Sequence, residues 1–148
     1  MSQVLSVRVT DDQHTRLRRL ARRFNQRSPS SALTLLLEEK LREVEHPLIQ
    51  FRDTALGRQP HVIGLGIEVW QLIMVAREFD FDTAKTARHL GVSQHLIEAA
   101  IAYRDAHPDE INEALADNDR LSDYAALQQV LPQLQLFVWS PAAEETDS

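Results

Sequence analysis

A short alternating segment at the N-terminus constrains the fold more than any other part of the chain. Residues 4–9 alternate between apolar and more polar positions, as a half-buried β-strand does. No second strand follows closely, so the backbone groups of this lone strand would lack partners in a monomer. One face of the strand consists of Leu5, Val7 and Val9, and the other of Val4, Ser6 and Arg8.

Two amphipathic helices are predicted directly after this segment. Thr10 and Gln13 form a capping-box pattern that begins the first helix, whose apolar stripe includes Leu17 and Leu20. A second helix is predicted for residues 32–45, with Ser30 or Ser31 as its N-cap. Two helices this short cannot cover all their leucines. We therefore expect residues 1–45 to form an intertwined homodimer, in which two strands pair antiparallel and the helices interlock.

The N-terminal segment resembles the ribbon-helix-helix family of MetJ, Arc and CopG type regulators. The resemblance rests on residues 6–12, the leucine stripe of the first helix and residues 28–33. It implies that the paired strands enter the DNA major groove, where Val4, Ser6 and Arg8 face base edges and Arg8 can bond guanine bidentately. It also implies that the start of the second helix, near Ser30 and Ser31, holds a phosphate.

The net charge of −6 conceals an uneven distribution. Residues 1–45 contain nine Lys and Arg against six Asp and Glu, whereas residues 109–148 contain one against nine. A basic N-terminal region suits DNA phosphates, and an acidic C-terminal region suits a protein partner. The alternative is a solvated basic helix followed by a solubilising tail.

The central part of the chain, residues 46–116, predicts a small helical domain. A loop or small hairpin is expected over residues 48–66, followed by helices over residues 67–79, 83–90 and 93–103. Residues 83–97 fit a helix-turn-helix with Gly91 at the turn. This segment either makes a second DNA contact through Gln94 and His95 or has a structural or dimerising role. Glu98 and the near-neutral charge argue against strong phosphate binding.

Residues 48–113 also resemble the domain-of-unknown-function 433 family, which is similar to homeodomain-like helical folds. Genes of that family often lie beside those of PIN-like ribonuclease toxins, so the resemblance implies such a toxin as a partner. Leu65 and Ile67 stand where the family more usually has Thr and Arg. The matching segments are residues 51–53, 57–60, 64, 69–70, 84–90, 99–103 and 107–111.

The C-terminal segment, residues 117–148, predicts a partner-binding tail. A break is expected at residues 117–119, then an amphipathic stretch, and then a strand-like alternation over residues 133–139. This tail either folds back as a local strand or docks on a protein partner by a helix or an added strand. The expected toxin-binding residues are Leu121, Tyr124, Leu131, Leu134, Leu136, Phe137 and Trp139.

The residues argue against catalysis and against a membrane protein. The chain has no Cys, its serines lack a nucleophile-elbow context, and no pair among its six His has metal-ligand spacing. We therefore expect no enzyme, no metal and no cofactor. Without a long apolar run or a signal-peptide pattern, a cytoplasmic protein is expected.

The pattern as a whole predicts a mainly α protein that acts as the DNA-binding antitoxin of a type II toxin-antitoxin system. Such a protein represses its own promoter and neutralises a PIN-like ribonuclease toxin through its C-terminal part. One alternative is a stand-alone dimeric repressor without a toxin. Another is an adaptor whose N-terminal segment serves only for dimerisation.

Overall fold

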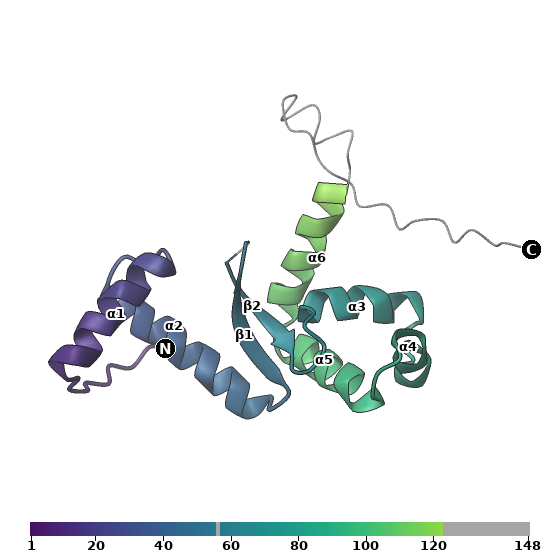
Figure 1. Ribbon diagram of the computed structural model, residues 1–148, viewed down its shortest axis with the longest axis horizontal. Coiled ribbons are helices and arrows are strands. Elements are labelled where there is room, and N and C mark those ends of the chain that lie inside the picture. The colour runs from purple at the N-terminus through teal and green to yellow at the C-terminus, as the bar shows by residue number, and fades with distance from the viewer. Residues whose placement is uncertain (56, 123–148) are drawn as a thin grey trace, which may run out of the picture.

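The computed structural model describes residues 1–55 and 57–122, and these form a mainly helical fold with one β-hairpin (Figure 1). The helices that precede the hairpin in the sequence lie on one side of it, and those that follow it lie on the other. The elements are α1 (Asp11–Arg23), α2 (Pro29–Glu45), β1 (Ile49–Thr54), β2 (Gly57–Val62), α3 (Val69–Glu78), α4 (Thr83–Leu90), α5 (Gln94–Ala106) and α6 (Pro108–Ser122).

The N-terminal segment of the single chain is not a strand. Residues 1–10 have no regular secondary structure, because nothing within one chain pairs with them. The capping box that follows is confirmed. The Thr10 hydroxyl accepts from the backbone N–H of Gln13 at 3.1 Å, and the Gln13 side chain accepts from the N–H of Thr10 at 2.9 Å. A strand at these residues would need a pairing partner that the single chain does not supply.

Helix α2 begins earlier than the sequence predicts. Its N-cap is Ser28, whose hydroxyl accepts from the backbone N–H of Ser31 at 3.1 Å, so the expectation of Ser30 or Ser31 as the cap was wrong. Pro29 explains the shift, because its fixed φ suits the first helical position and its missing N–H costs nothing there. Ser30 and Ser31 therefore lie inside the first turn of α2.

The hairpin and the four helices after it share one hydrophobic core. Strands β1 and β2 pair antiparallel from Ile49 opposite Val62 to Thr54 opposite Gly57, which confirms the small hairpin. Ile49 and Val62 are buried against helices α3 and α5. The other large buried side chains of this core are Val69, Leu72, Ile73, Ile97, Tyr103 and Ile111.

Helices α4 and α5 pack against each other across a tight turn, in the segment where the sequence predicts a helix-turn-helix. Gly91 caps α4 with φ of +67°, a left-handed conformation that glycine adopts without a Cβ penalty. Helix α6, in contrast, runs through residues 117–119, so the predicted break there was wrong. Packing of α6 on α3 overrides the weak helix propensity of these residues, and Asn118 lies 3.7 Å from the Met74 sulfur.

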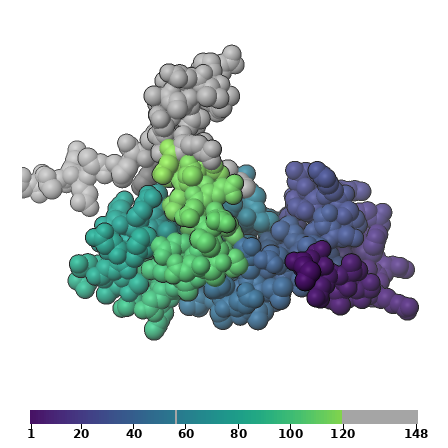
Figure 2. Space-filling view, turned by 180° about the vertical axis from the view of Figure 1, so that it is seen from behind, coloured from purple at the N-terminus to yellow at the C-terminus, as the bar shows by residue number. Residues whose placement is uncertain are grey.

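The two ends of the described chain lie far apart on the surface. Figure 2 shows the N-terminal residues and α1 at one end of the molecule and α3–α6 at the other, with α2 and the hairpin between them. Within the described residues, no helix is both long enough and apolar enough to span a bilayer.

Candidate dimer and nucleic-acid interface

The N-terminal arm, residues 1–10, is exposed over its whole length. Leu5 and Val7 on its predicted apolar face are 84% and 62% exposed, and Val4 on the other face is 97% exposed. Ser6 and Arg8 are exposed as well. All the residues predicted to contact bases thus lie on one accessible segment that leads directly into α1.

A second exposed apolar surface lies on α2. Four residues at helical spacing form it, and we call it the α2 stripe: Leu33, Leu37, Leu41 and Val44. Leu37 and Val44 are 54% and 67% exposed. Contiguous apolar surface of this kind on a single chain is typical of an interface, because leaving it in water is unfavourable.

A groove joins the arm to the two helices. It has a volume of about 390 Å³, and its wall combines Arg8 and Val9 of the arm with leucines of α1 and α2. The leucines are Leu17, Leu20, Leu33 and Leu36. The core of the N-terminal unit is therefore incomplete in one chain, and its open side lies where the arm passes.

The start of α2 offers less to a phosphate than the sequence predicts. The backbone N–H of Ser31 bonds the Ser28 hydroxyl, and the Ser31 hydroxyl lies 2.8 Å from it. Both groups of Ser31 are thus engaged in the helix cap. Ser30 is exposed, so it is the more accessible of the two predicted phosphate contacts.

The predicted second DNA contact is engaged in local hydrogen bonds. Gln94 donates to Thr83 at 2.9 Å and to Glu98 at 3.0 Å, and the His95 ring lies 3.2 Å from the same Glu98 carboxylate. Glu98 therefore places negative charge at the centre of the would-be DNA-contacting face. This arrangement favours a structural role for the α4–α5 pair over binding to phosphates.

Of the predicted toxin-binding residues, only Leu121 lies in a described element, the last turn of α6. The other six lie outside the described residues: Tyr124, Leu131, Leu134, Leu136, Phe137 and Trp139.

A network of ion pairs joins the N-terminal helices to the hairpin, and sequence reasoning missed it. The Arg58 guanidinium donates to both oxygens of the buried Glu39 carboxylate, at 2.7 and 3.0 Å. It also donates to Asp53 at 3.0 Å and lies 4.9 Å from the centre of the Phe24 ring. Arg23 of α1 pairs with Asp53 as well. Arg58 hydrogen-bonds Asp53, and Arg23 adds positive charge, so the pKa of this carboxyl is lowered.

A second group of polar contacts joins α2 to the far half of the molecule. Arg42 donates to Glu38 at 2.7 Å, to the Tyr103 hydroxyl at 3.0 Å and to Glu110 of α6. The Tyr103 hydroxyl in turn donates to Glu110 at 3.1 Å. Burial raises the pKa of Tyr103, so the hydroxyl remains a hydrogen-bond donor.

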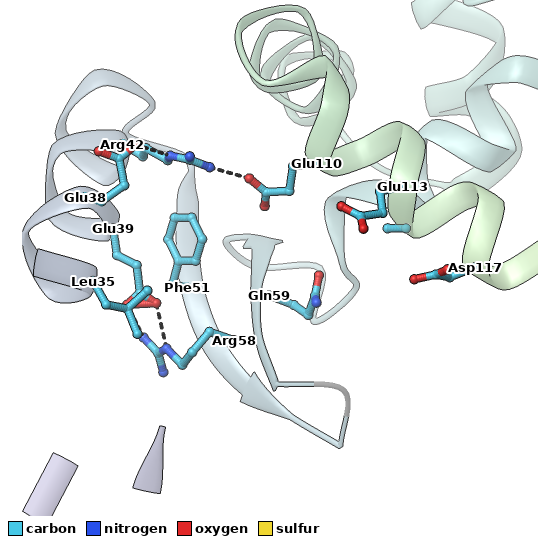
Figure 3. A pocket seen from close by; sticks show the side chains of 11 residues that line it. Leu35, Glu38, Glu39, Arg42, Phe51, Arg58, Gln59, Glu110, Glu113 and Asp117 are labelled. Carbon is cyan, nitrogen blue, oxygen red and sulfur yellow. Dashed lines mark hydrogen bonds and ion pairs between the residues drawn. The ribbon is translucent and has the colours of Figure 1, made fainter. Parts of the chain in front are cut away.

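The pair of Arg58 with Glu39 and the contacts of Arg42 with Glu38 and Glu110 line a cleft of about 300 Å³ between α2, the hairpin and α6 (Figure 3). Phe51 and Leu35 contribute its apolar surface, and Glu113 adds a further carboxylate. The partners are distant in sequence, 19 positions apart for Glu39 and Arg58 and 68 for Arg42 and Glu110. The sequence contains one indication of these contacts. Helical spacing places Glu39 and Arg42 on the side of α2 opposite the α2 stripe.

The fold and the interface together describe a mainly helical protein with an exposed N-terminal arm beside an incomplete apolar core. No family model, curated protein or solved structure matches this chain. The function is therefore inferred from the residues of this chain.

Proposed function

We propose that the chain is a homodimeric DNA-binding regulator whose two N-terminal arms pair as an antiparallel ribbon. The observation that carries this proposal is the coincidence of three features at one place. The arm is exposed and unpaired, the α2 stripe is exposed, and the groove between them is lined by leucines of both helices. A second copy would supply both the missing strand partner and the missing apolar cover.

The charges around the arm support DNA as the ligand. Arg8 lies on the exposed arm, and the exposed side of α1 adds Arg16, Arg18, Arg19 and Arg22. Of these, Arg16 contacts Asp12 only loosely, at 3.5 Å between two exposed side chains. In the proposed complex Arg8 contacts base edges, and the helix arginines attract the DNA at longer range.

The regulator is further proposed to be the antitoxin of a PIN-like ribonuclease. This part rests on the resemblance of residues 48–113 and on the acidic C-terminal region, which suits the basic substrate site of a ribonuclease. A stand-alone dimeric repressor is the alternative, since the arm and the α2 stripe serve either equally.

Fluorescence anisotropy with a duplex from upstream of the protein's own gene tests DNA binding. We expect Arg8→Ala to weaken binding by about 10-fold or more, because a bidentate base contact is lost. Arg77→Ala, on the exposed end of α3, is the matched control and should bind as the wild type does. If Arg8→Ala binds with unchanged affinity, the ribbon does not read this DNA and the adaptor alternative holds.

Co-expression with the product of the adjacent gene tests the antitoxin proposal. The informative truncation ends after Ser122, because α6 extends to that residue and a cut after Asn118 would remove part of the helix. We expect the full chain to co-purify with the neighbouring product and the truncated chain to lose it. A complex that survives truncation contradicts docking by the tail, whereas the absence of any complex favours the stand-alone repressor.

A further inference from the structure

Two histidines and a glutamate meet where the two halves of the molecule join. His46 ends α2, His107 ends α5, and Glu45 precedes His46. One potential ligand atom from each of these three residues lies within 4.8 Å of the others. The sequence predicts no metal site, because the two histidines are far apart along the chain and share no spacing pattern.

The His107 ring carries an unused ligand atom. Its Nε2 is buried and has no hydrogen-bond partner among the described residues. A buried nitrogen without a partner is unfavourable, so such an atom in a native fold calls for an explanation.

The local backbone and packing suit a cation. His46 and His107 are both C-caps, and their N–H groups bond Arg42 and Tyr103 carbonyls at 2.8 and 2.9 Å. Two negative helix ends thus converge on the cluster. The Tyr103 ring packs against both imidazoles, with centroids 5.2 and 4.8 Å away, and so limits their orientations. The positive charge of Arg42, which lies in the last turn of α2, is already paired with Glu38 and Glu110.

We propose that Glu45, His46 and His107 bind one divalent transition-metal ion of the zinc class. Two imidazole nitrogens and a carboxylate oxygen are a common donor set for zinc, with water as the fourth ligand. Tetrahedral coordination places ligand atoms about 3.4 Å apart, so metal binding would draw the three ligand atoms, now within 4.8 Å of one another, closer together. The proposal is independent of DNA binding and of any toxin.

Such an ion would hold the end of α2 against the junction between α5 and α6. The same junction contains the contacts of Arg42 with Tyr103 and Glu110. A bound metal would therefore reinforce the attachment of the N-terminal unit to the rest of the molecule and raise its thermal stability.

Isothermal titration of the untagged full-length protein with zinc chloride tests the site. We expect one ion per chain, and we expect His46→Gln and His107→Gln each to weaken binding by about 10-fold or more. His95→Gln, an exposed histidine on α5, is the matched control and should bind as the wild type does. The absence of saturable binding to the wild type, or unchanged affinity of both His variants, overturns the proposal.

A second measurement guards against a folding defect in the packed His107 variant. Thermal unfolding is followed with and without zinc, and far-UV circular dichroism checks that each variant is folded. We expect zinc to raise Tm for the wild type and for His95→Gln, but not for His46→Gln. An equal rise for His46→Gln means that zinc binds elsewhere, and the proposal fails.

Discussion

At the scale of single residues, the contact between Arg58 and Glu39 attaches α2 to the hairpin through a buried carboxylate. Glu39 is only 5% exposed, and both its oxygens accept from Arg58. We expect Arg58→Ala to lower the free energy of unfolding by about 2–3 kcal/mol, because it leaves a buried carboxylate unpaired. Urea unfolding at fixed protein concentration measures the change.

Arg52→Ala is the matched control for this prediction. Arg52 is an exposed arginine of the same hairpin, and its hydrogen bond to Gln50 is long, at 3.4 Å. We expect a change within about 0.5 kcal/mol. Combining Arg58→Ala with Glu39→Leu should recover part of the lost stability, because the unpaired charge is then gone. Equal stability of Arg58→Ala and Arg52→Ala would show that the buried pair does not support the fold.

Asp53 gives the same joint a dependence on pH. The hydrogen bond from Arg58 and the charge of Arg23 lower the pKa of Asp53 in the folded protein. A carboxyl with a lowered pKa stabilises the fold above its ordinary pKa and loses this contribution as the pH falls through the folded value. We therefore expect stability to decline below about pH 5, and to decline less steeply in Asp53→Asn. Urea unfolding between pH 3 and 7 checks this prediction, and identical profiles would contradict it.

At the scale of elements, two assignments of the N-cap of α2 can be compared: Ser28 in the structure and Ser30, a candidate from the sequence. The Ser28 hydroxyl accepts from the N–H of Ser31. Ser30, the second residue of α2, is exposed. We expect Ser28→Ala to cost about 1 kcal/mol and Ser30→Ala to cost almost nothing. Thermal or urea unfolding of the two variants compares them directly. A larger loss for Ser30→Ala would restore the assignment that the sequence favours.

The helices are the part of the fold that sequence patterns predict best. The capping box of Thr10 and Gln13, the turn at Gly91 and the span of α4 are local features, and all three are confirmed. Helix α6 is different, because residues 117–119 are weak helix formers that contacts with α3 hold in the helix. Sequence patterns do not contain such tertiary contacts.

The candidate site likewise has one part that local sequence patterns predict and another that depends on tertiary contacts. The α2 stripe follows from helical spacing alone, and the exposure of its four residues agrees with the expected shortage of apolar cover. The contacts of Arg58 and Arg42 could not be predicted, because they join residues that only the finished fold brings together. The same reason hides the cluster of His46 and His107.

At the scale of the whole molecule, α2 serves two surfaces at once. One side carries the exposed α2 stripe, whereas the other is fixed to the hairpin and to α6 by Glu39, Arg42 and Glu43. The Glu43 carboxylate accepts from the backbone N–H of Phe51 at 3.0 Å. A dimer formed through the stripe would therefore orient the two α3–α6 units, because these polar contacts attach the helix that joins the copies to each unit.

A charge placed in the middle of the α2 stripe tests this dimer. Leu37 is more than half exposed in one chain, so Leu37→Glu should leave each chain folded. In the proposed dimer the same change buries a carboxylate in an apolar interface in both copies. We expect the dimer dissociation constant to rise at least about 100-fold, because each copy also loses leucine burial. Sedimentation velocity over a range of concentrations measures it.

Ala84→Glu provides the control, since Ala84 is an exposed residue of α4 far along the chain from the α2 stripe. This variant should sediment as the wild type does and keep the concentration-dependent Tm of a dimer. Because paired arms require two chains, Leu37→Glu should also lose DNA binding at concentrations where it is monomeric, with Arg8 intact. If Leu37→Glu remains dimeric, the stripe is not the interface, and the arm must find its strand partner through a different association.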